Sequence, residues 1–282
     1  MYIDAHTHLN SDQLYPDRHT HLSEFQGVWW TALINIWVNH QRNQRAIEIT
    51  TKNPTDIFMK CAIGLHPGEV SLWHISSDTQ ITKEIEQLKR LYEKNSEHIV
   101  AIGECWIDAH YTWYKTVSSL QKELLFRQGC VAREYKLPLI IHSRDQFEDT
   151  FDVLQEFTDL KIYFHCRWYT PRDIITLHHT FPSLWIWFCW NTTYPKAQQL
   201  RDSILTAHQI SQWTHKNTIS WHSVRLLLET DAPYLSPQQK RWTQNTPSHI
   251  PYLYDAVSDY LSTPKELVCK HTETNFYALY TN

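Results

Sequence analysis

The chain has 282 residues, of which 42% are hydrophobic and 20% charged; this is typical of a globular protein and excludes a disordered chain. Its formal net charge of −4 argues against a protein that wraps a long duplex, because Lys and Arg supply most non-specific affinity for nucleic acid. No apolar run reaches the roughly 20 residues of a membrane-spanning helix, and the N-terminal residues lack a signal-peptide pattern, so we expect a cytoplasmic protein without membrane association.

Short apolar runs rich in β-branched residues recur along the chain and predict eight strands. In chain order they are Tyr2–Ile3, Ala32–Val38, Ile57–Ile63, Ile99–Gly103, Leu137–Ile141, Ile162–Phe164, Leu184–Cys189 and Val224–Leu228. Their continuous apolar character is typical of strands that are buried on both faces, as in parallel sheets.

Helical patterns lie between these runs. Ile81, Ile85 and Leu88 fall on one helical stripe, and Leu120, Leu124, Gln128 and Val131 follow a similar spacing with one polar break at Gln128. Two segments, 170–173 and 263–266, each combine a threonine, a proline and an acid in the order that begins a helix.

Strands that alternate with helices indicate βαβ units, and eight such strands predict a closed barrel. The length also fits the roughly 250 residues that are typical of this architecture. We therefore predict an α/β protein whose residues 1–282 form a single (β/α)8 TIM barrel. The polar, proline-bounded segment Gln238–His249 is expected to be a loop near the barrel mouth.

Six cysteines are spread along the chain without a CxxC pair: Cys61, Cys105, Cys130, Cys166, Cys189 and Cys269. This distribution argues against a disulfide framework and against a zinc ribbon. We expect all of them to be reduced thiols in the core.

The first predicted strand ends in Asp4-Ala-His6-Thr-His8. The period-2 alternation of a strand directs both imidazoles to one side, and two nitrogen ligands on one rigid element suit a divalent metal. An isolated HxH pair is more often a pair of hydrogen-bonded structural histidines.

Further polar groups follow other strands of the predicted barrel. They are Glu104 after the fourth strand, His142 after the fifth, His165 after the sixth, and Glu229 with Asp231 after the eighth. The carboxyl ends of barrel strands converge on the mouth, where active sites of this fold lie. Four histidines and up to three carboxylates suffice for two ions bridged by a carboxylate, and the absence of thiolate ligands suits Zn, Mn, Co or Mg.

The same residues stand in longer motifs: IDAHTHL, AIGLHPGEV, AIGEC, LPLIIHSRD, FHC, RLLLETDAPYLSP and TETNFYALY. From the first strand to the last helix, the sequence resembles the TatD-type metal-dependent deoxyribonucleases, a family of amidohydrolase-like barrels. The resemblance implies a first metal held by His6, His8, Glu104 and Asp231, and a second held by Glu104, His142 and His165. It also implies that His66 lies near the scissile phosphate and that Glu229 is a second acid beside Asp231.

These residues predict a phosphodiester hydrolase with two divalent ions, in which Asp231 orients or deprotonates the attacking water. The resemblance implies that the substrate is single-stranded DNA, digested from an end, with magnesium or a similar ion as activator. We expect a monomer.

Three side chains keep two interpretations each. His66 either contacts substrate or is a turn histidine fixed before Pro67. Arg144 either binds a phosphate in bidentate fashion or braces a carboxylate. Asp108 either supports the metal ligands or caps a loop.

Two other functions fit the same residues. Fold and metal do not determine the substrate, so an amide, a lactone or a phosphotriester could replace the phosphodiester. A barrel that has lost catalysis and acts as a binding protein is the other alternative; the complete ligand set argues against it, whereas the many tryptophans favour it.

The chain contains 5 glycines and 13 tryptophans, whereas average usage gives about 20 glycines for this length. Tryptophans 37, 106, 187, 190 and 242 stand where the family motifs have glycine. A bulky residue is a poor substitute where glycine permits positive φ or close backbone approach. We hypothesise that the source organism reads UGA as glycine and that UGA is rendered here as tryptophan. The alternative is a genuinely tryptophan-rich barrel whose loops have moved to accommodate the rings.

Overall fold

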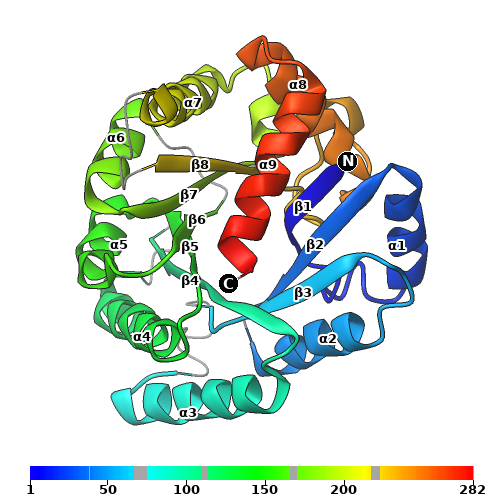
Figure 1. Cartoon of the computed structure of the whole chain (residues 1–282). Coiled ribbons are helices and arrows are strands. Elements are labelled where there is room, and N and C mark those ends of the chain that lie inside the picture. The colour runs from blue at the N-terminus through cyan, green and yellow to red at the C-terminus, as the bar shows by residue number, and fades with distance from the viewer. Residues whose placement is uncertain (38, 67–74, 110–113, 166–169, 217–222, 282) are drawn as a thin grey trace.

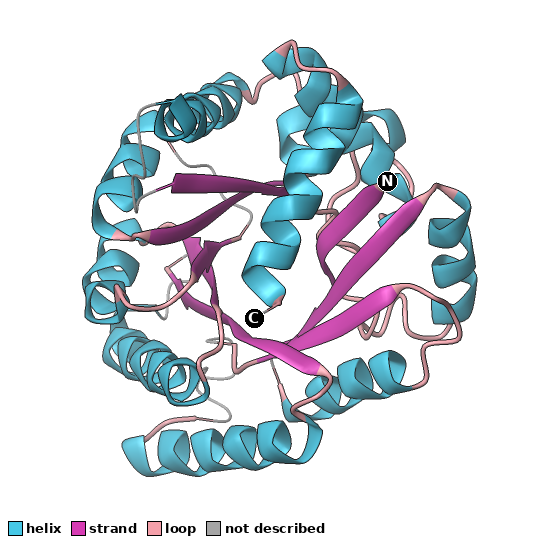
Figure 2. Cartoon of the chain, in the orientation of Figure 1, coloured by secondary structure: helices cyan, strands magenta, loops and turns pink. Residues whose placement is uncertain are grey.

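The computed structural model describes residues 1–37, 39–66, 75–109, 114–165, 170–216 and 223–281. Eight parallel strands form one sheet in the order β1 to β8, and helices surround it (Figures 1 and 2). The predicted (β/α)8 barrel is confirmed.

All eight predicted strands are present; β6 has the predicted bounds, and the other seven differ by a few residues. They are β1 (Tyr2–Thr7), β2 (Trp30–Trp37), β3 (Phe58–Ile63), β4 (Ile99–Asp108), β5 (Leu139–Arg144), β6 (Ile162–Phe164), β7 (Ser183–Phe188) and β8 (Ser223–Leu228). The longer helices are α1 (Arg18–Gly27), α2 (His40–Thr51), α3 (Asp78–Asn95), α4 (Tyr114–Tyr135), α5 (Phe147–Leu154), α6 (Pro171–Thr180), α7 (Gln198–Lys216), α8 (Ile250–Leu261) and α9 (Lys265–Tyr280).

The largest difference from the prediction is β4, which continues past Gly103 to Asp108. After a register irregularity between Ile102 and Cys105, its last residues pair with β5 up to the match of Asp108 with Arg144. Glu104 therefore lies inside a strand rather than after one. The extension could not be predicted because Glu104 and Asp108 interrupt the apolar run. Their place in the strand depends on pairing with β5, which the local sequence does not show.

The two predicted helix starts have different outcomes. At α6, Thr170 and Asp173 exchange side-chain to backbone hydrogen bonds of 3.1 and 2.9 Å, so the capping box is present as expected. At α9, the residue before the helix is Pro264 and Thr263 makes no capping bond, so that helix begins one residue later than expected. The segment Gln238–His249 is a loop that contains two single-turn 3₁₀ helices, η4 (Gln238–Lys240) and η5 (Pro247–His249).

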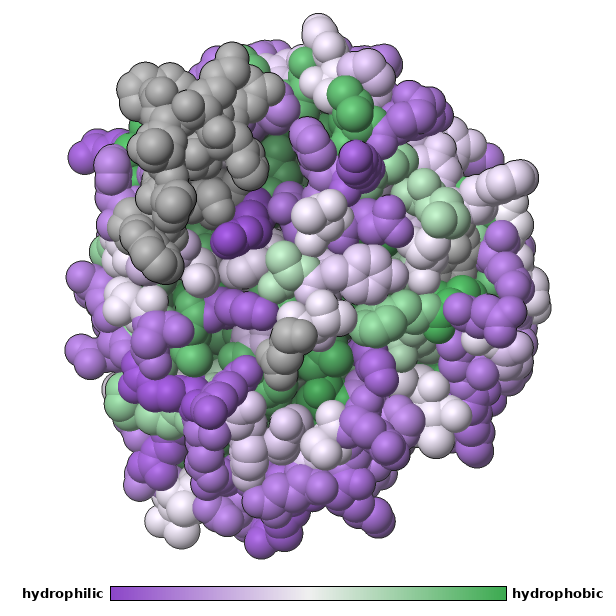
Figure 3. All heavy atoms as spheres, in the orientation of Figure 1, coloured by the Kyte–Doolittle hydropathy of each residue, from purple (hydrophilic) through white to green (hydrophobic). Residues whose placement is uncertain are grey.

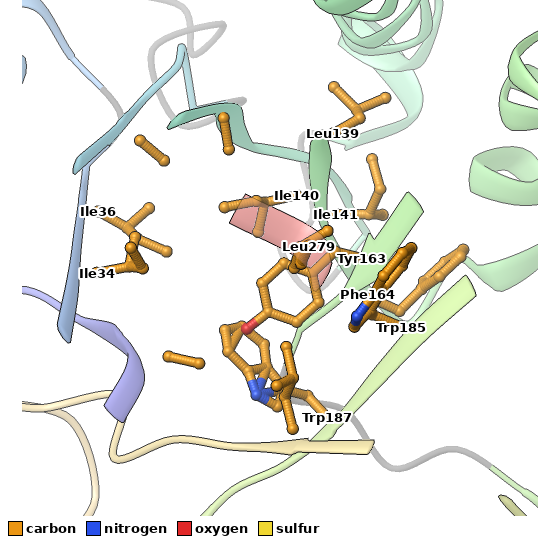
Figure 4. Packing of buried hydrophobic residues seen from close by; sticks show 14 of the residues in the cluster. Ile34, Ile36, Leu139, Ile140, Ile141, Tyr163, Phe164, Trp185, Trp187 and Leu279 are labelled. Carbon is orange, nitrogen blue, oxygen red and sulfur yellow. The ribbon is translucent and has the colours of Figure 1, made fainter. Parts of the chain in front are cut away.

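Helix α9 crosses the amino-terminal end of the barrel, the face seen in Figures 1 and 3, whose rim is mostly hydrophilic. The Trp185 indole N–H donates to the Asn275 carbonyl at 2.9 Å, and the Lys161 ammonium donates to the Ala278 carbonyl at 2.9 Å. In the barrel interior, Figure 4 shows Tyr163 beside Trp187, with Leu279 of α9 near them. Since α9 closes this end, the opposite end holds the carboxyl ends of the strands.

The barrel closes between β1 and the segment that follows β8. The Asp231 N–H donates to the His6 carbonyl at 3.0 Å, and the His8 N–H donates to the Ala232 carbonyl at 2.7 Å. Asp4 accepts from both the backbone N–H and the hydroxyl of Thr230, at 3.0 and 2.5 Å. We call this join the β1–β8 seam.

The cysteines depart in part from the expectation of reduced core thiols. Cys61, Cys105 and Cys269 are free and buried, whereas the free Cys130 is exposed on α4. Cys189 is disulfide-bonded, so the expectation is wrong for it. Cys166 lies outside the described residues. None of the helices in the described part combines the length and apolar character needed to cross a membrane.

Candidate metal centre

His6 and His8 project from β1 and from the residue just after it toward one point. Their Nε2 atoms are 3.1 Å apart, and both rings are buried. The Nδ1 of His8 lies 2.7 Å from the Ile36 carbonyl, which can only accept, so that nitrogen carries the proton. The lone pair of His8 is therefore on Nε2, the atom that faces His6.

Glu104 lies between two groups of histidines. Its Oε2 is 3.8 Å from His6 Nε2, while its Oε1 is 2.9 Å from His142 Nδ1 and 3.1 Å from His165 Nε2. Each carboxylate oxygen thus faces a different set of nitrogen atoms. A carboxylate in this position can bridge two cations.

Asp231 completes the first group from the far side of the seam. Its Oδ1 is 3.2 Å from His8 Nε2 and 3.7 Å from His6 Nε2. The backbone of Asp231 has a φ of 54°, a left-handed conformation that few residues other than glycine adopt. Local strain of this kind persists where surrounding contacts enforce it, and here the backbone N–H is held by His6.

Glu229 lies behind the histidines rather than among the converging ligand atoms. It is fully buried, and its carboxylate is 2.9 Å from His165 Nδ1 and 3.5 Å from His6 Nδ1. Both contacts are made to the ring nitrogen opposite the one that faces Glu104. A carboxylate on the far nitrogen sets the tautomer and the orientation of a ligand histidine.

His66 is positioned by amide side chains that hold the backbone before it. Gln128 of α4 exchanges two hydrogen bonds with the backbone of Leu65, at 2.7 and 3.0 Å, and Asn43 of α2 donates to the Gly64 carbonyl at 3.0 Å. The polar break in the apolar stripe of α4 is therefore the residue that fixes this loop. Burial, opposed by Glu104, lowers the pKa of His66 to about 3.

Two glycines let the His66 segment approach β4. A Cβ on Gly64 would lie 2.6 Å from the carbonyl carbon of Gly103, and Gly103 itself has a φ of 149°. A side chain on Gly64 would push the two backbones apart, and one on Gly103 would meet Ile140 of β5 at 2.6 Å. The close approach brings His66 into the electrostatic range of Glu104.

The structure gives only part of the surroundings of two candidate site residues, Arg144 and Asp108. Arg144 is the last residue of β5, but its side chain lies outside the described residues, as do Pro67 and the side chains of Trp37 and Trp106. Asp108 is buried at the end of β4, and its N–H is held by Gln121 at 3.0 Å. This contact does not decide between its two interpretations.

Carboxyl groups are concentrated at the metal centre. Among the described side chains, Glu104, Glu229 and Asp231 form ion pairs with histidines and with no lysine or arginine. Burial by itself would lower the pKa of His165, yet Glu229, Glu104 and Asp231 raise that pKa well above its ordinary value. Carboxylates held this close to one another favour a bound positive ion.

The donor set fits divalent metals. Three overlapping groups place one ligand atom from each member within 4.8 Å of the others: His6, His165 and Asp231; His6, His8 and Glu104; and Glu104, His142 and His165. Imidazole nitrogen and carboxylate oxygen are the ligands that Zn, Mn and Co accept, and Mg accepts the carboxylates. The structure thus brings together the six residues that the sequence singled out as ligands.

Three residues that matter to the site were not given a role from the sequence. Asp4 fixes the β1–β8 seam, Gln128 holds the loop before His66, and Tyr234 packs its ring against His8 with centroids 5.4 Å apart. The sequence offered a signal for two of them: Asp4 is an acid two residues before His6, and Gln128 interrupts an apolar helical stripe.

Comparison with known proteins agrees with this site. The family model described as TatD related DNase matches residues 3–281. The chain is 25% identical to the uncharacterized metal-dependent hydrolase YabD of Bacillus subtilis, with 99% of each chain covered. It is 26% identical to the 3'-5' ssDNA/RNA exonuclease TatD of Erwinia billingiae, covering 99% of this chain and 98% of the relative.

Among solved structures, the fold matches that of YJJV, a TatD homologue from Escherichia coli, with a TM-score of 0.81 and 21% identity over 100% of this chain and 98% of the other. The similarity to this structure supports the fold alone. The family model and the relatives match at the level of sequence. The chain belongs to the family of TatD-related DNases, and it is a metal-dependent hydrolase acting on ester bonds.

Proposed function

We propose that this protein is a two-metal phosphodiesterase that removes nucleotides from an end of single-stranded DNA. The observation that supports two ions is the position of Glu104, whose two oxygens face two separate groups of nitrogen ligands. The name of the Erwinia relative supports the substrate class. Two divalent ions (Mg, Mn, Zn or Co) would activate a water and stabilise charge on the leaving oxygen.

Each of the chain's own residues then has a distinct task. Asp231, with part of its side chain exposed to the pocket, orients the attacking water and accepts its proton. Glu229 acts through His165 and His6 by holding their rings, because it is buried behind them. Arg144, the last residue of β5, would bind a phosphate of the substrate.

His66 would contact the substrate. Because the pKa of His66 is about 3, its ring is neutral at neutral pH and offers one N–H donor to a phosphate oxygen. We expect His66→Ala to lower kcat by about 100-fold, the effect of losing one donor to a developing charge. Metal analysis of the same variant should give the wild-type content. The exposed His179 on α6, changed to alanine, is the matched control. A His66→Ala protein that loses metal would instead make His66 a ligand.

The substrate class is tested with the purified, metal-loaded protein on oligonucleotides labelled at either end, beside a lactone and a phosphotriester. We expect a ladder of products shortened from one end of the single-stranded oligonucleotide and negligible turnover of the other two compounds. Asp231→Asn is the control for a contaminating nuclease. Efficient turnover of the lactone or phosphotriester, with intact oligonucleotides, would overturn the proposal, and so would an identical ladder from Asp231→Asn.

A further inference from the structure

The loop after β8 exposes large apolar side chains beside the metal centre. Two of the nine exposed large hydrophobic residues among the described residues are neighbours in this loop: Tyr234 (44% exposed) and Leu235 (59%). The guanidinium of Arg241 lies 5.5 Å from the centroid of the Tyr194 ring, whose hydroxyl contacts the same loop. Neighbouring exposed apolar side chains at the edge of a site can mark a place where a ligand binds.

Tyr234 links this surface to the metal ligands. Its ring meets His8 edge to face, with centroids 5.4 Å apart and planes inclined by 75°. The backbone N–H of Tyr234 donates to the Asp231 carbonyl at 2.9 Å. One side of the ring is thus fixed against a ligand histidine, while 44% of the residue stays exposed.

The loop is held in shape although its tip is exposed. One amide, Asn245 Nδ2, donates to the carbonyls of Thr230, Tyr234 and Leu235 at 2.8, 2.9 and 3.1 Å. Nearby, the Tyr194 hydroxyl donates to the Ser236 carbonyl at 2.8 Å. A surface that is rigid before binding loses little conformational entropy when a partner binds.

We propose that Tyr234 is the platform on which an unpaired base stacks when its nucleotide lies at the metal centre, with Arg241 contacting the strand beyond it. This rests on the proposed function and adds the feature that selects single strands. Every base presents a π face to an aromatic ring, so stacking binds single strands of any sequence. A base inside a duplex is already stacked on both sides and cannot offer a face.

The charge of the chain favours such a contact. With a net charge of −4, the protein has little basic surface with which to neutralise phosphates away from the metal centre. Stacking supplies affinity that does not depend on phosphate charge. It also accounts for the exposed face of Tyr234 beside a metal-ligand histidine.

The test uses single-stranded oligonucleotides that carry one abasic nucleotide at successive positions from the cleaved end. For the wild-type protein we expect an abasic nucleotide at one position to lower kcat/KM by about 5- to 150-fold, the range measured for one stacked base. Tyr234→Ala should remove this discrimination, so that normal and abasic oligonucleotides are cleaved at similar rates. Tyr234→Phe, which keeps the ring, should retain it.

The control is Trp29→Ala, an aromatic residue 80% exposed at the opposite end of the barrel, where its carbonyl accepts from Tyr2. It should discriminate like the wild type. An unchanged discrimination in Tyr234→Ala, in a protein that cleaves oligonucleotides, would overturn this proposal alone. A wild-type protein that cleaves no oligonucleotide would overturn the proposed function and this proposal with it.

Discussion

Replacing Glu104 by Gln is expected to abolish turnover while leaving the barrel folded. The carboxylate faces His6 on one side and His142 with His165 on the other, so the amide removes an anionic group whose two oxygens face different sets of ligands. A loss of at least about 1,000-fold in kcat, roughly 4 kcal/mol, corresponds to the stabilisation that metal ions give in such reactions. Turnover of an end-labelled oligonucleotide and metal content by mass spectrometry measure the two effects.

The matched control is Glu97→Gln, whose carboxylate is 82% exposed just before β4. It should keep wild-type activity and wild-type metal content. The circular dichroism spectrum should be the same for the wild type and both variants. Near-normal turnover by Glu104→Gln would show that the bridging role is wrong.

The second large effect is expected at Trp187, one of the tryptophans that stand at glycine positions of the family motifs. Its ring is fully buried, its centroid is 3.6 Å from that of Tyr163, and its indole nitrogen has no hydrogen-bond partner among the described residues. A buried donor without a partner costs about 1 to 3 kcal/mol, and overpacking costs a similar amount. We expect Trp187→Gly to raise Tm by a few degrees, about 2 to 4 °C per kcal/mol in a chain of this size.

Trp185 on the same strand is the control. It is equally buried, but its indole N–H donates to the Asn275 carbonyl at 2.9 Å and Arg225 lies over its ring. Trp185→Gly should therefore lower the free energy of unfolding by about 3 to 5 kcal/mol or more. If both variants lose stability alike, Trp187 is a genuine core residue and the tryptophan-rich barrel is the correct alternative.

The recoding hypothesis itself is decided by peptide mass spectrometry of the protein from its native cells, or by the codons. We expect UGA codons and glycine in the native peptides at positions 37, 106, 187, 190 and 242. Trp29 adds an observation that the motifs did not supply, because it follows the end of α1 with a φ of 66°, where helices commonly end in glycine. UGG codons at these positions would refute the hypothesis.

The parts of this fold that depend on local sequence could be predicted, and the parts that depend on distant partners could not. Apolar runs revealed the eight strands, but the extension of β4 to Asp108 depends on pairing with β5. His6 and His8 share a strand, so their common direction follows from its period of two residues. Gln128 is different, because its role follows from the backbone of Leu65, 63 positions earlier in the chain.

The β1–β8 seam has a consequence for the order in which the protein acquires activity. The hydrogen bonds between Asp4 and Thr230 join residues 226 positions apart, and His6 and His8 meet Asp231 across the same join. Contacts of such long sequence separation form late, because the entropy of closing the loop must be overcome first. During synthesis, the first strand therefore waits until residues 229–231 have been made, and an incomplete chain on the ribosome cannot assemble the metal centre.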